Sequence, residues 1–433
     1  MNDDIVITGM GVVTPIGGSV ESFWEANLTG KSGIVPETRM DVSRLPCGWV
    51  GGIIPEDVKK SVREEFGRPD RSWGDTLMHS ALEQALRDAK FESGSLAGPA
   101  GLIWARVWPG PSGSFPEDYV SHMTEVAARF AKVGNDPAAV MAHLKTQTLP
   151  KEVTDMSSFP TEVSRRLGTP LVATRLEATC SGGLRAIAEA ARLLRSGKVE
   201  FAVVTASVSR STPYVLSQYG QLMALSKWKG EAAQSSMPFD KRRSGMVINE
   251  SAGAIVLETA EHARLRGLKN VHAVVGGWGL AVGTEHITAP KVEAVEGVMR
   301  GALTHAGLTA SDIDTVNAHG TSTRLNDITE ARALHRVFGE RMATLDVSAV
   351  KSLTGHGSAA SGVVESIVSA LTLCRGVIPP VVTCTEPDPK CAVKTNLTPV
   401  ERPVKAVLKN SFGFGGQYAS MVFTRPENPR VAA

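Results

Sequence analysis

The 433-residue sequence is poor in cysteine and aromatic residues, and it lacks a long apolar run. Its five cysteines are odd in number and sparse for the length, which predicts free thiols in a reducing compartment. No stretch approaches the roughly 18 apolar residues of a membrane span. The N-terminus lacks the charged segment and cleavage site of a secretory signal. We therefore expect a cytoplasmic protein without membrane segments.

The sequence also lacks a strong charge of either sign, with 46 basic against 44 acidic residues and a net charge of +2. No block of basic residues is interleaved with aromatic ones, which argues against nucleic-acid binding. Cys374, Cys384 and Cys391 lack the CxxC spacing and nearby histidines of a zinc site, so no metal is expected. What is present is an ordinary globular composition, 42% hydrophobic and 21% charged.

The chain repeats one rhythm of strands and helices. A buried strand and a glycine turn open the sequence at 5–17, and a similar start follows at 271–277. After each start, apolar strands alternate with helices whose apolar residues recur every three or four positions. This rhythm predicts an α/β fold of two duplicated halves, 1–260 and 261–433.

Two local features interrupt or refine that rhythm. The segment from about 108 to 156 opens with a turn rich in proline, glycine and serine and then holds two amphipathic stretches. It is predicted to be an inserted helical cap on the N-terminal half. Residues 246–248 and 254–257 are short apolar runs that are expected to pair as a hairpin.

The segment from Glu177 to Gly183 places a cysteine where a helix is predicted to begin. Cys180 is followed by Ser181, Gly182 and Gly183, and then by apolar residues at helical spacing. The partial positive charge and unsatisfied N–H groups of a helix N-terminus favour the thiolate. Glycines after the sulfur let a thioester approach the backbone. Cys180 is therefore a candidate nucleophile.

Three further segments carry polar groups among glycine and serine at predicted strand ends. They read Asn-Ala-His-Gly-Thr-Ser-Thr at 317–323, Lys-Ser-Leu-Thr-Gly-His-Gly at 351–357 and Asn-Ser-Phe-Gly-Phe-Gly-Gly at 410–416. Each alone has an ordinary explanation as a satisfied core histidine or a tight turn. The four segments together, in this order, are hard to explain by chance.

With these four motifs the chain resembles the β-ketoacyl–acyl carrier protein synthases of the elongating type, the condensing enzymes of fatty acid and type II polyketide synthesis. The resemblance runs from Ile5 to Phe423. It implies a thiolase-like fold of five layers, α-β-α-β-α, built from two duplicated halves and usually dimeric. It also implies decarboxylative Claisen condensation of an acyl thioester on Cys180 with malonyl-acyl carrier protein, and no cofactor.

The resemblance and the chemistry of the groups together assign catalytic roles. Cys180 would form an acyl-enzyme, and the N–H groups of Cys180 and Phe414 would form its oxyanion hole. His319 and His356, as neutral imidazoles, would donate Nε2–H to the malonyl thioester oxygen as an enolate forms. Lys351 would organise the same site electrostatically.

Further residues are assigned to the surroundings of these groups. Glu330 is expected to balance the charge of Lys351. Phe414 also matches the mobile gate of the family, and Thr321 and Thr323 match positions that face the pantetheine arm of the carrier.

The acyl pocket is where the chain departs from the family pattern. The usual Gly-Glu-Gly is Asn249-Glu250-Ser251, and the usual pair of leucines after His356 is Gly357-Ser358. These departures are expected to lie around the pocket and to affect the substrate rather than the reaction. Tyr219 and Met223 fall in a region that lines the acyl channel in the family. Their bulk predicts a specialised acyl group, short, cyclic or aryl.

Alternative functions on the same fold remain open. A non-catalytic chain-length subunit would lack the cysteine, and a thiolase would carry a second cysteine near the C-terminal glycines. A ketosynthase subunit that works only with a chain-length-factor partner stays open, as does an acyltransferase that moves the acyl group from Cys180 to an alcohol or amine. The expected partners are an acidic acyl carrier protein and a second subunit, as a homodimer or a heterodimer with a related chain. The carrier is expected to dock on basic residues, namely Arg242, Arg243, Arg264 and Arg266.

Overall fold

The computed structural model describes residues 4–39, 42, 47, 49–68, 71–91, 98–105, 138, 158–209, 213–268, 271–283 and 287–426. The predicted cap at 108–156 lies outside the described residues apart from Ala138. Within the described ranges, no helix has both the length and the apolar character needed to cross a membrane. All five cysteines lie in this part of the chain, and none forms a disulfide.

One ten-stranded sheet runs through the protein in the order β10-β9-β13-β14-β8-β1-β7-β6-β4-β5. When the strands of each half are counted along the chain, both halves have the order third, second, fourth, fifth, first. The halves meet where β1 pairs with β8 through only two residue pairs. The strands of the N-terminal half are β1 (Ile5–Val13), β4 (Ala100–Ala105), β5 (Leu171–Leu176), β6 (Phe201–Ser209) and β7 (Glu250–Thr259). Those of the C-terminal half are β8 (Ala273–Val282), β9 (Thr315–Asn317), β10 (Asp346–Ser348), β13 (Ala406–Gly413) and β14 (Gln417–Thr424).

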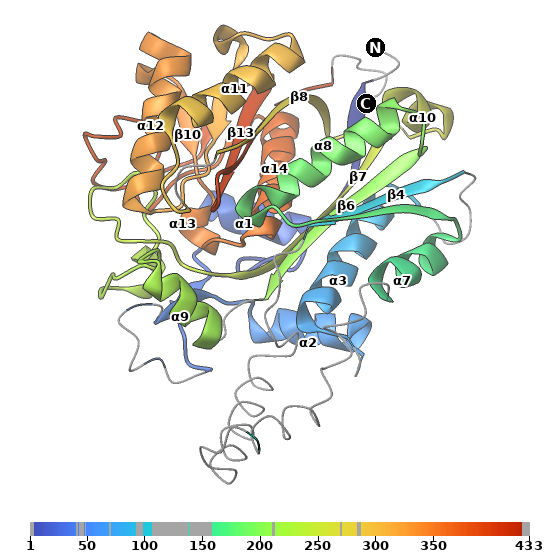
Figure 1. The fold of residues 1–433 in the computed structure, drawn as a ribbon, viewed down its shortest axis with the longest axis horizontal. Helices are drawn as coiled ribbons and strands as arrows, with labels where there is room; N and C mark the ends of the chain where they lie inside the picture. The colour runs from blue at the N-terminus through green and yellow to red at the C-terminus, as the bar shows by residue number, and fades with distance from the viewer. Residues whose placement is uncertain are drawn as a thin grey trace.

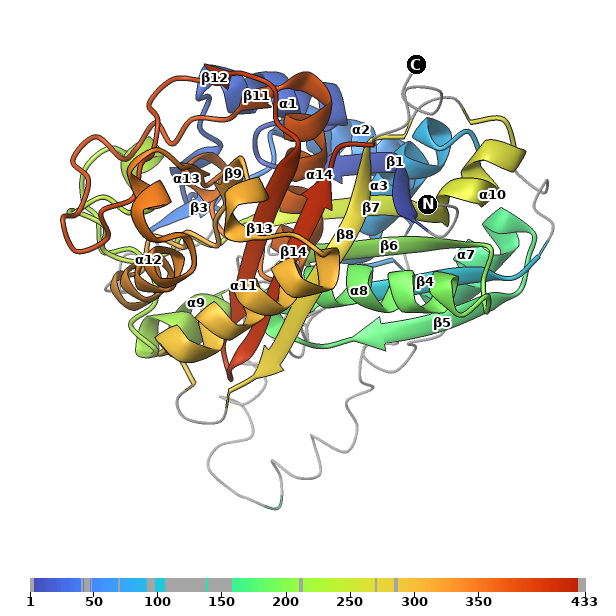
Figure 2. The ribbon, with the colours of Figure 1, turned by 90° about the horizontal axis from the view of Figure 1, so that it is seen from above.

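Helices cover both faces of each half-sheet and produce five layers (Figures 1 and 2). Helices α8 (Gly182–Arg195) and α14 (Ala359–Arg375) form the middle layer, and each contacts strands of both halves. Helix α3 (Trp73–Asp88) packs on the outer face of the N-terminal half. Helix α11 (Val292–Ala306) packs on the outer face of the C-terminal half, and α12 (Arg324–Phe338) packs against α11. The predicted α/β fold of five layers is therefore confirmed.

The middle layer depends on a close approach of two glycines. A Cβ atom on Gly183 of α8 would lie 2.8 Å from the Cα of Gly362 and 2.7 Å from the nitrogen of Val363, both in α14. Only glycine lets the two helices cross at this separation. Because α14 lies between two half-sheets, it is apolar around most of its circumference, and nearly all of its residues are buried.

The predicted hairpin of 246–248 with 254–257 is wrong. Residues 254–257 belong to β7, which pairs antiparallel with β1 and β6. Residues 246–248 instead form isolated bridges, Met246 to Leu225 and Ile248 to His356. The structure uses this run to support the loop that carries a candidate catalytic histidine.

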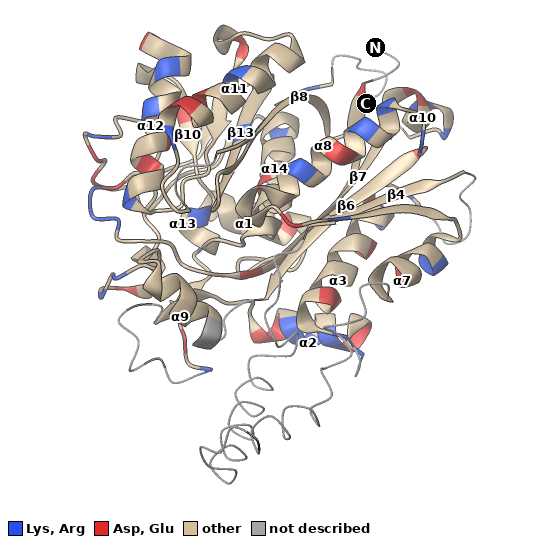
Figure 3. Ribbon diagram, in the orientation of Figure 1, with Lys and Arg blue, Asp and Glu red and all other residues tan. Residues whose placement is uncertain are grey.

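The remaining elements are short or peripheral, and charged residues gather on outer helices such as α2 and α12 rather than on the central strands (Figure 3). The other helices are α1 (Val20–Thr29), α2 (Glu56–Phe66), α7 (Ser158–Leu167), α9 (Pro213–Gln221), α10 (Ala260–Leu265) and α13 (Lys351–Thr354). The other strands are β2 (Ile34–Pro36), β3 (Val50–Gly52), β11 (Val377–Ile378) and β12 (Val400–Glu401).

Candidate active site

Cys180 lies in a single 3₁₀ turn, Thr179–Ser181, immediately before α8. The turn is sharp, because Thr179 has a positive φ of 45°, a conformation that costs a non-glycine residue free energy. The end of β13 holds it in place, since Ser411 Oγ donates to the Cys180 carbonyl at 2.7 Å. Thr179 Oγ1 also donates to the Phe414 carbonyl at 3.2 Å. The cysteine is thus fixed at the start of a helix, where the sequence placed it.

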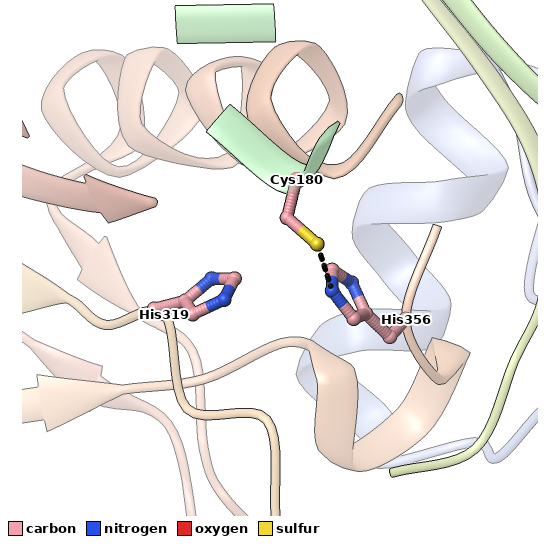
Figure 4. Close-up of side chains that lie close together, drawn as sticks. All are labelled: Cys180, His319 and His356. Carbon is pink, nitrogen blue, oxygen red and sulfur yellow. Dashed lines mark hydrogen bonds between the residues drawn. The ribbon is translucent and has the colours of Figure 1, made fainter. Parts of the chain in front are cut away.

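Both predicted histidines come to this sulfur from the C-terminal half. His319 follows β9 and His356 follows α13. The Nε2 atom of His356 lies 3.0 Å from the Cys180 Sγ, and the two imidazole rings stand edge to face with centroids 5.3 Å apart. The three side chains converge on one point, each with a ring nitrogen or sulfur within 4.8 Å of the others (Figure 4).

Both imidazoles are neutral at physiological pH. Burial, and then the nearby Lys351 ammonium, lowers the pKa of each well below 6.5. A hydrogen bond with the Phe412 backbone acts in the opposite direction on the His319 pKa, but burial outweighs it. Lys351 Nζ lies 3.4 Å from His319 Nδ1. Because an ammonium group only donates, this contact favours the His319 tautomer in which Nδ1 accepts and Nε2 carries the proton.

Lys351 belongs to a buried ion cluster with Glu365 and Lys409. Lys351 Nζ lies 2.5 Å from Glu365 Oε1, and Lys409 Nζ lies 2.6 Å from Glu365 Oε2. Lys351 also donates to the His319 carbonyl at 2.7 Å. Burial lowers the pKa of Lys409 to about 8 even though Glu365 favours its charged form. Glu365 therefore balances Lys351, and the assignment of that role to Glu330 is wrong.

Glu330 instead holds the loop that carries His319. Its two carboxylate oxygens accept from the backbone N–H groups of His319 at 2.8 Å and Gly320 at 2.9 Å. The Asn410 amide donates to the same carboxylate at 3.1 Å. Glu330 is the seventh residue of α12, and its side chain reaches back to the histidine loop.

Sequence reasoning missed Glu365 and Lys409, although the sequence held a signal for both. Glu365 is the one charged residue in the apolar run 357–374, and Lys409 follows three apolar residues of a strand. A charge in a run that must be buried needs a partner, because an unpaired buried charge costs several kcal/mol. One run carries the negative Glu365 and the other the positive Lys409, so together they predict an ion pair between these two residues.

Cys180 lines an open pocket of about 440 Å³, a volume that includes solvent at its mouth. Thr321 and Thr323 line it as expected, with their hydroxyls 2.9 Å apart. Phe414 also lines it, and the Tyr219 ring packs near that phenylalanine with centroids 6.1 Å apart. Met223 is 74% exposed in a left-handed turn after α9, so its assignment to the channel lining in this chain is wrong.

The four basic residues expected to receive a carrier do not form one surface. Arg243 is buried and lies 2.7 Å from Asp388, and Arg242 lies 2.8 Å from Asp240. Arg264 belongs to α10, and Arg266 follows it, at the opposite end of the protein from α9 (Figure 1). They pair with Glu261 and Glu258 at 2.7 and 2.6 Å. In the folded chain each of these four arginines is therefore paired with an acidic side chain of the same protein.

Cys180, His319 and His356 also have the separations of a metal-ligand set. A thiolate and two imidazoles suit a soft divalent cation such as Zn²⁺. Such an ion would occupy the same sulfur that an acyl group would occupy, so ligation and acylation would exclude each other.

Comparison with known proteins agrees with this geometry. A model of the beta-ketoacyl synthase N-terminal domain matches residues 2–263, and one of the C-terminal domain matches residues 272–385. The chain therefore belongs to the β-ketoacyl synthase family, a class of acyl-transferring condensing enzymes.

Individual relatives match over nearly the whole length. The 3-oxoacyl-[acyl-carrier-protein] synthase 2 of Vibrio cholerae is 32% identical over 428 residues, which cover 97% of this chain and 99% of the relative. That of Coxiella burnetii is 30% identical over 437 residues, covering 97% and 98%.

Solved structures show the same fold. The ishigamide ketosynthase/chain length factor superposes with a TM-score of 0.84 at 28% identity, covering 98% of this chain and all of that one. A type II polyketide synthase acyl-carrier protein in complex with its ketosynthase bound to the hexaketide gives 0.82 at 27% identity, with the same coverage.

Proposed function

We propose that this β-ketoacyl synthase holds an acyl group on Cys180 and condenses it with a malonyl group on an acyl carrier protein. One observation carries the assignment of these residues. A buried thiol at a helix start lies 3.0 Å from the Nε2 of a neutral imidazole, with a second neutral imidazole in the same pocket.

In the first half-reaction, the Cys180 sulfur attacks the thioester carbonyl of the acyl carrier. The carbon–sulfur bond to the carrier breaks, and the carrier leaves as a thiol with the proton that Cys180 gives up. The backbone N–H groups of Cys180 and Phe414 are our candidates for the oxyanion hole. Gly413 suits this arrangement, because its Cα packs so close to the turn that a Cβ there would lie 3.1 Å from the Cys180 nitrogen.

In the second half-reaction, the malonyl group loses carbon dioxide. The electrons of the broken carbon–carbon bond form an enolate, whose carbon attacks the acyl carbonyl and expels the Cys180 thiolate. Nε2–H donors on His319 and His356 would stabilise the thioester oxygen while negative charge builds on it. Neutral donors suit this role, because an imidazolium is acidic enough to protonate the enolate and remove the carbon nucleophile before it attacks.

The two related structures indicate the partners. One contains an acyl-carrier protein bound to its ketosynthase and the other a ketosynthase with a chain length factor. We propose that this chain also receives its substrates from a carrier and pairs with a second subunit in the cytoplasm. Strand β5 is one of the two edges of the sheet, the other being β10, and Val172 on β5 is 37% exposed, as an edge that a second subunit covers would be.

A ketosynthase that works only with a chain-length-factor partner is the second candidate, favoured by the first of those structures. We also retain the division at 260, which the repeated strand order supports. For the acyl group, we still propose a short, cyclic or aryl chain, since Tyr219 packs beside Phe414 next to the pocket.

The test is to incubate the purified protein with a ladder of acyl carriers and then with malonyl carrier. Intact-mass measurement should show one acyl adduct, lost in Cys180→Ala and retained in Cys391→Ala, which removes another buried thiol. Carbon dioxide and a β-ketoacyl product should follow. An adduct that persists in Cys180→Ala would contradict the function, and preferential loading of long saturated chains would contradict the substrate.

A further inference from the structure

Three residues that depart from the family pattern lie next to the loop that carries His356. The structure places Asn249, Ser251 and Gly357 in contact with one another, and none of them lines the pocket. For these three residues, the expectation that they lie around the acyl pocket is therefore wrong. They surround the support of a catalytic histidine instead.

The first part of this support holds the backbone of His356. The Asn249 backbone N–H donates to the His356 carbonyl at 3.2 Å, and the His356 N–H donates to the Val247 carbonyl at 2.6 Å. The Asn249 side chain donates to the Gly355 carbonyl at 3.3 Å. Ser251 Oγ in turn donates to Asn249 Oδ1 at 3.0 Å. These bonds fix the loop from both sides.

The second part explains why glycine follows the histidine. A Cβ atom on Gly357 would lie 2.5 Å from Ser251 Oγ and 2.8 Å from Asn249 Oδ1. The side chains at 249 and 251 therefore occupy the space that a side chain at 357 would need. We infer that the three departures are one packing exchange, in which two polar side chains take the place of one apolar side chain.

The third part is Ser361, a buried residue in the first turn of α14. Its hydroxyl oxygen lies 3.1 Å from His356 Nδ1 and accepts the Gly357 N–H at 2.9 Å. A hydroxyl has one proton and two lone pairs. The Gly357 N–H occupies one lone pair, and among the described contacts His356 Nδ1 is the one acceptor within hydrogen-bond distance of the hydroxyl proton, so we assign the hydroxyl as the donor to Nδ1.

We propose that Ser361 is a positioning residue that keeps the proton of neutral His356 on Nε2, the nitrogen that faces Cys180. Nδ1 accepts from the serine hydroxyl, so the ring donates from the opposite nitrogen into the pocket. Lys351 does the same for His319 through an ammonium group. The two histidines thus present equivalent donors from different supports, one cationic and one neutral.

This inference rests on the proposed catalytic role of His356. Removing the hydroxyl leaves Nδ1 without its donor, and the tautomer with the proton on Nδ1 is no longer disfavoured. Substitutions of groups that orient a catalytic or metal-bound histidine typically cost 10- to 100-fold in activity. We expect a loss of about that size in the condensation step, because only that step uses the Nε2–H donor.

The test compares Ser361→Ala with Ser366→Ala, which removes another buried hydroxyl from the same helix. Ser366 bonds only to the Gly362 carbonyl, at 2.6 Å, among the described contacts. Ser361→Ala should lower kcat for condensation while acylation of Cys180 and KM for malonyl carrier change little. Nitrogen-15 NMR of labelled histidine should show His356 shifting toward the Nδ1-protonated tautomer, its signal identified by its absence in His356→Gln.

Equal kcat and an unchanged tautomer in the two serine variants would overturn the role of Ser361. If Cys180→Ala retained turnover, the proposed function would fail instead, so the two failures are distinguishable. The packing exchange has its own test. Gly357→Leu should lower activity and thermal stability, and the triple variant Asn249→Gly, Ser251→Gly, Gly357→Leu should recover stability. A triple variant no more stable than Gly357→Leu would contradict the exchange.

Discussion

In the N-terminal half, the third strand, β5, leads to Cys180 and then to the middle-layer helix α8. In the C-terminal half the third strand, β10, leads to Lys351, His356 and the matching helix α14. The two helices meet at Gly183 and Gly362. Equivalent positions of a duplicated fold thus supply a nucleophile on one side and its histidine on the other, within 3.0 Å of each other.

The halves differ in the chemistry that surrounds these equivalent positions. The middle helix of the C-terminal half carries a buried carboxylate, Glu365, that pairs with two lysines. In α8 the ion pair among the described contacts lies at the surface, between Glu189 and the exposed Arg192. The C-terminal half thus places a buried ion cluster of Lys351, Glu365 and Lys409 beside the two histidines. The N-terminal half contributes the thiol at the start of a helix.

The largest expected effect comes from removing the negative charge of this buried ion cluster. Glu365→Gln would leave two buried ammonium groups without a counter-charge and should cost about 3–5 kcal/mol in the free energy of unfolding. The matched variant in the other half, Glu189→Gln, breaks a surface pair and should cost less than about 1 kcal/mol. Urea denaturation of both variants measures the difference. Similar losses would show that the halves do not differ in this way.

The contact between the halves is the next target. In Gly183→Ala, the new Cβ would meet backbone atoms of Ala359, Gly362 and Val363 at 2.7–2.8 Å, which pushes α8 away from α14. We expect a loss of about 1–3 kcal/mol from overpacking and a condensation rate at least about tenfold lower, since the thiol and His356 move apart. Gly297→Ala, on the open face of α11, is the control. Equal rates for the two variants would contradict the coupling.

A soft metal ion should bind ligands from both halves at the same time. We expect micromolar-range Zn²⁺, on the order of 10 µM, to block acylation of Cys180 reversibly, with recovery on chelation. Mg²⁺, which prefers oxygen ligands, serves as the control. His319→Ala and His356→Ala should each weaken the inhibition. Inhibition that both variants leave intact would place the ion elsewhere.

The smallest effect concerns pH, which should change the stability of the protein but not its condensation rate. Because both site histidines have pKa values well below 6.5 in the folded state, lowering the pH through 6.5 should not lower the condensation rate. The unfolded chain then binds protons that the folded site does not, so these groups lower stability as the pH falls below 6.5.

His272, outside the site, provides the opposite sign. Burial lowers the His272 pKa, but the Asp88 carboxylate at 2.8 Å and Cys374 together raise it to about 9. The stabilising contribution of His272 is therefore present below pH 6.5 and is lost as the pH rises through about 9. Thermal unfolding across pH checks both trends, with His272→Gln as the control for the alkaline side. A rate that follows a titration near 6.5 would contradict the neutral histidines.

Much of the fold and the central trio could be predicted from the sequence. Helix α11 shows why, because its apolar residues recur at regular helical spacing and Gly307 ends it. The trio was found because each group lies in a short motif of glycine and serine. The hairpin at 246–248 failed because an apolar run does not reveal its pairing partner, which here is the loop of His356.

The sequence by itself determined the reaction class, because the nucleophile and both histidines lie in motifs whose meaning is local. Only the tertiary structure decided how those groups are held. Glu365, Lys409 and Ser361 come from separate segments, and their roles depend on which side chain lies within hydrogen-bond reach of which. Linear order carries no distance between segments, and hydrogen bonds and ion pairs at 2.5–3.1 Å arise only when the two half-sheets pack around one pair of helices.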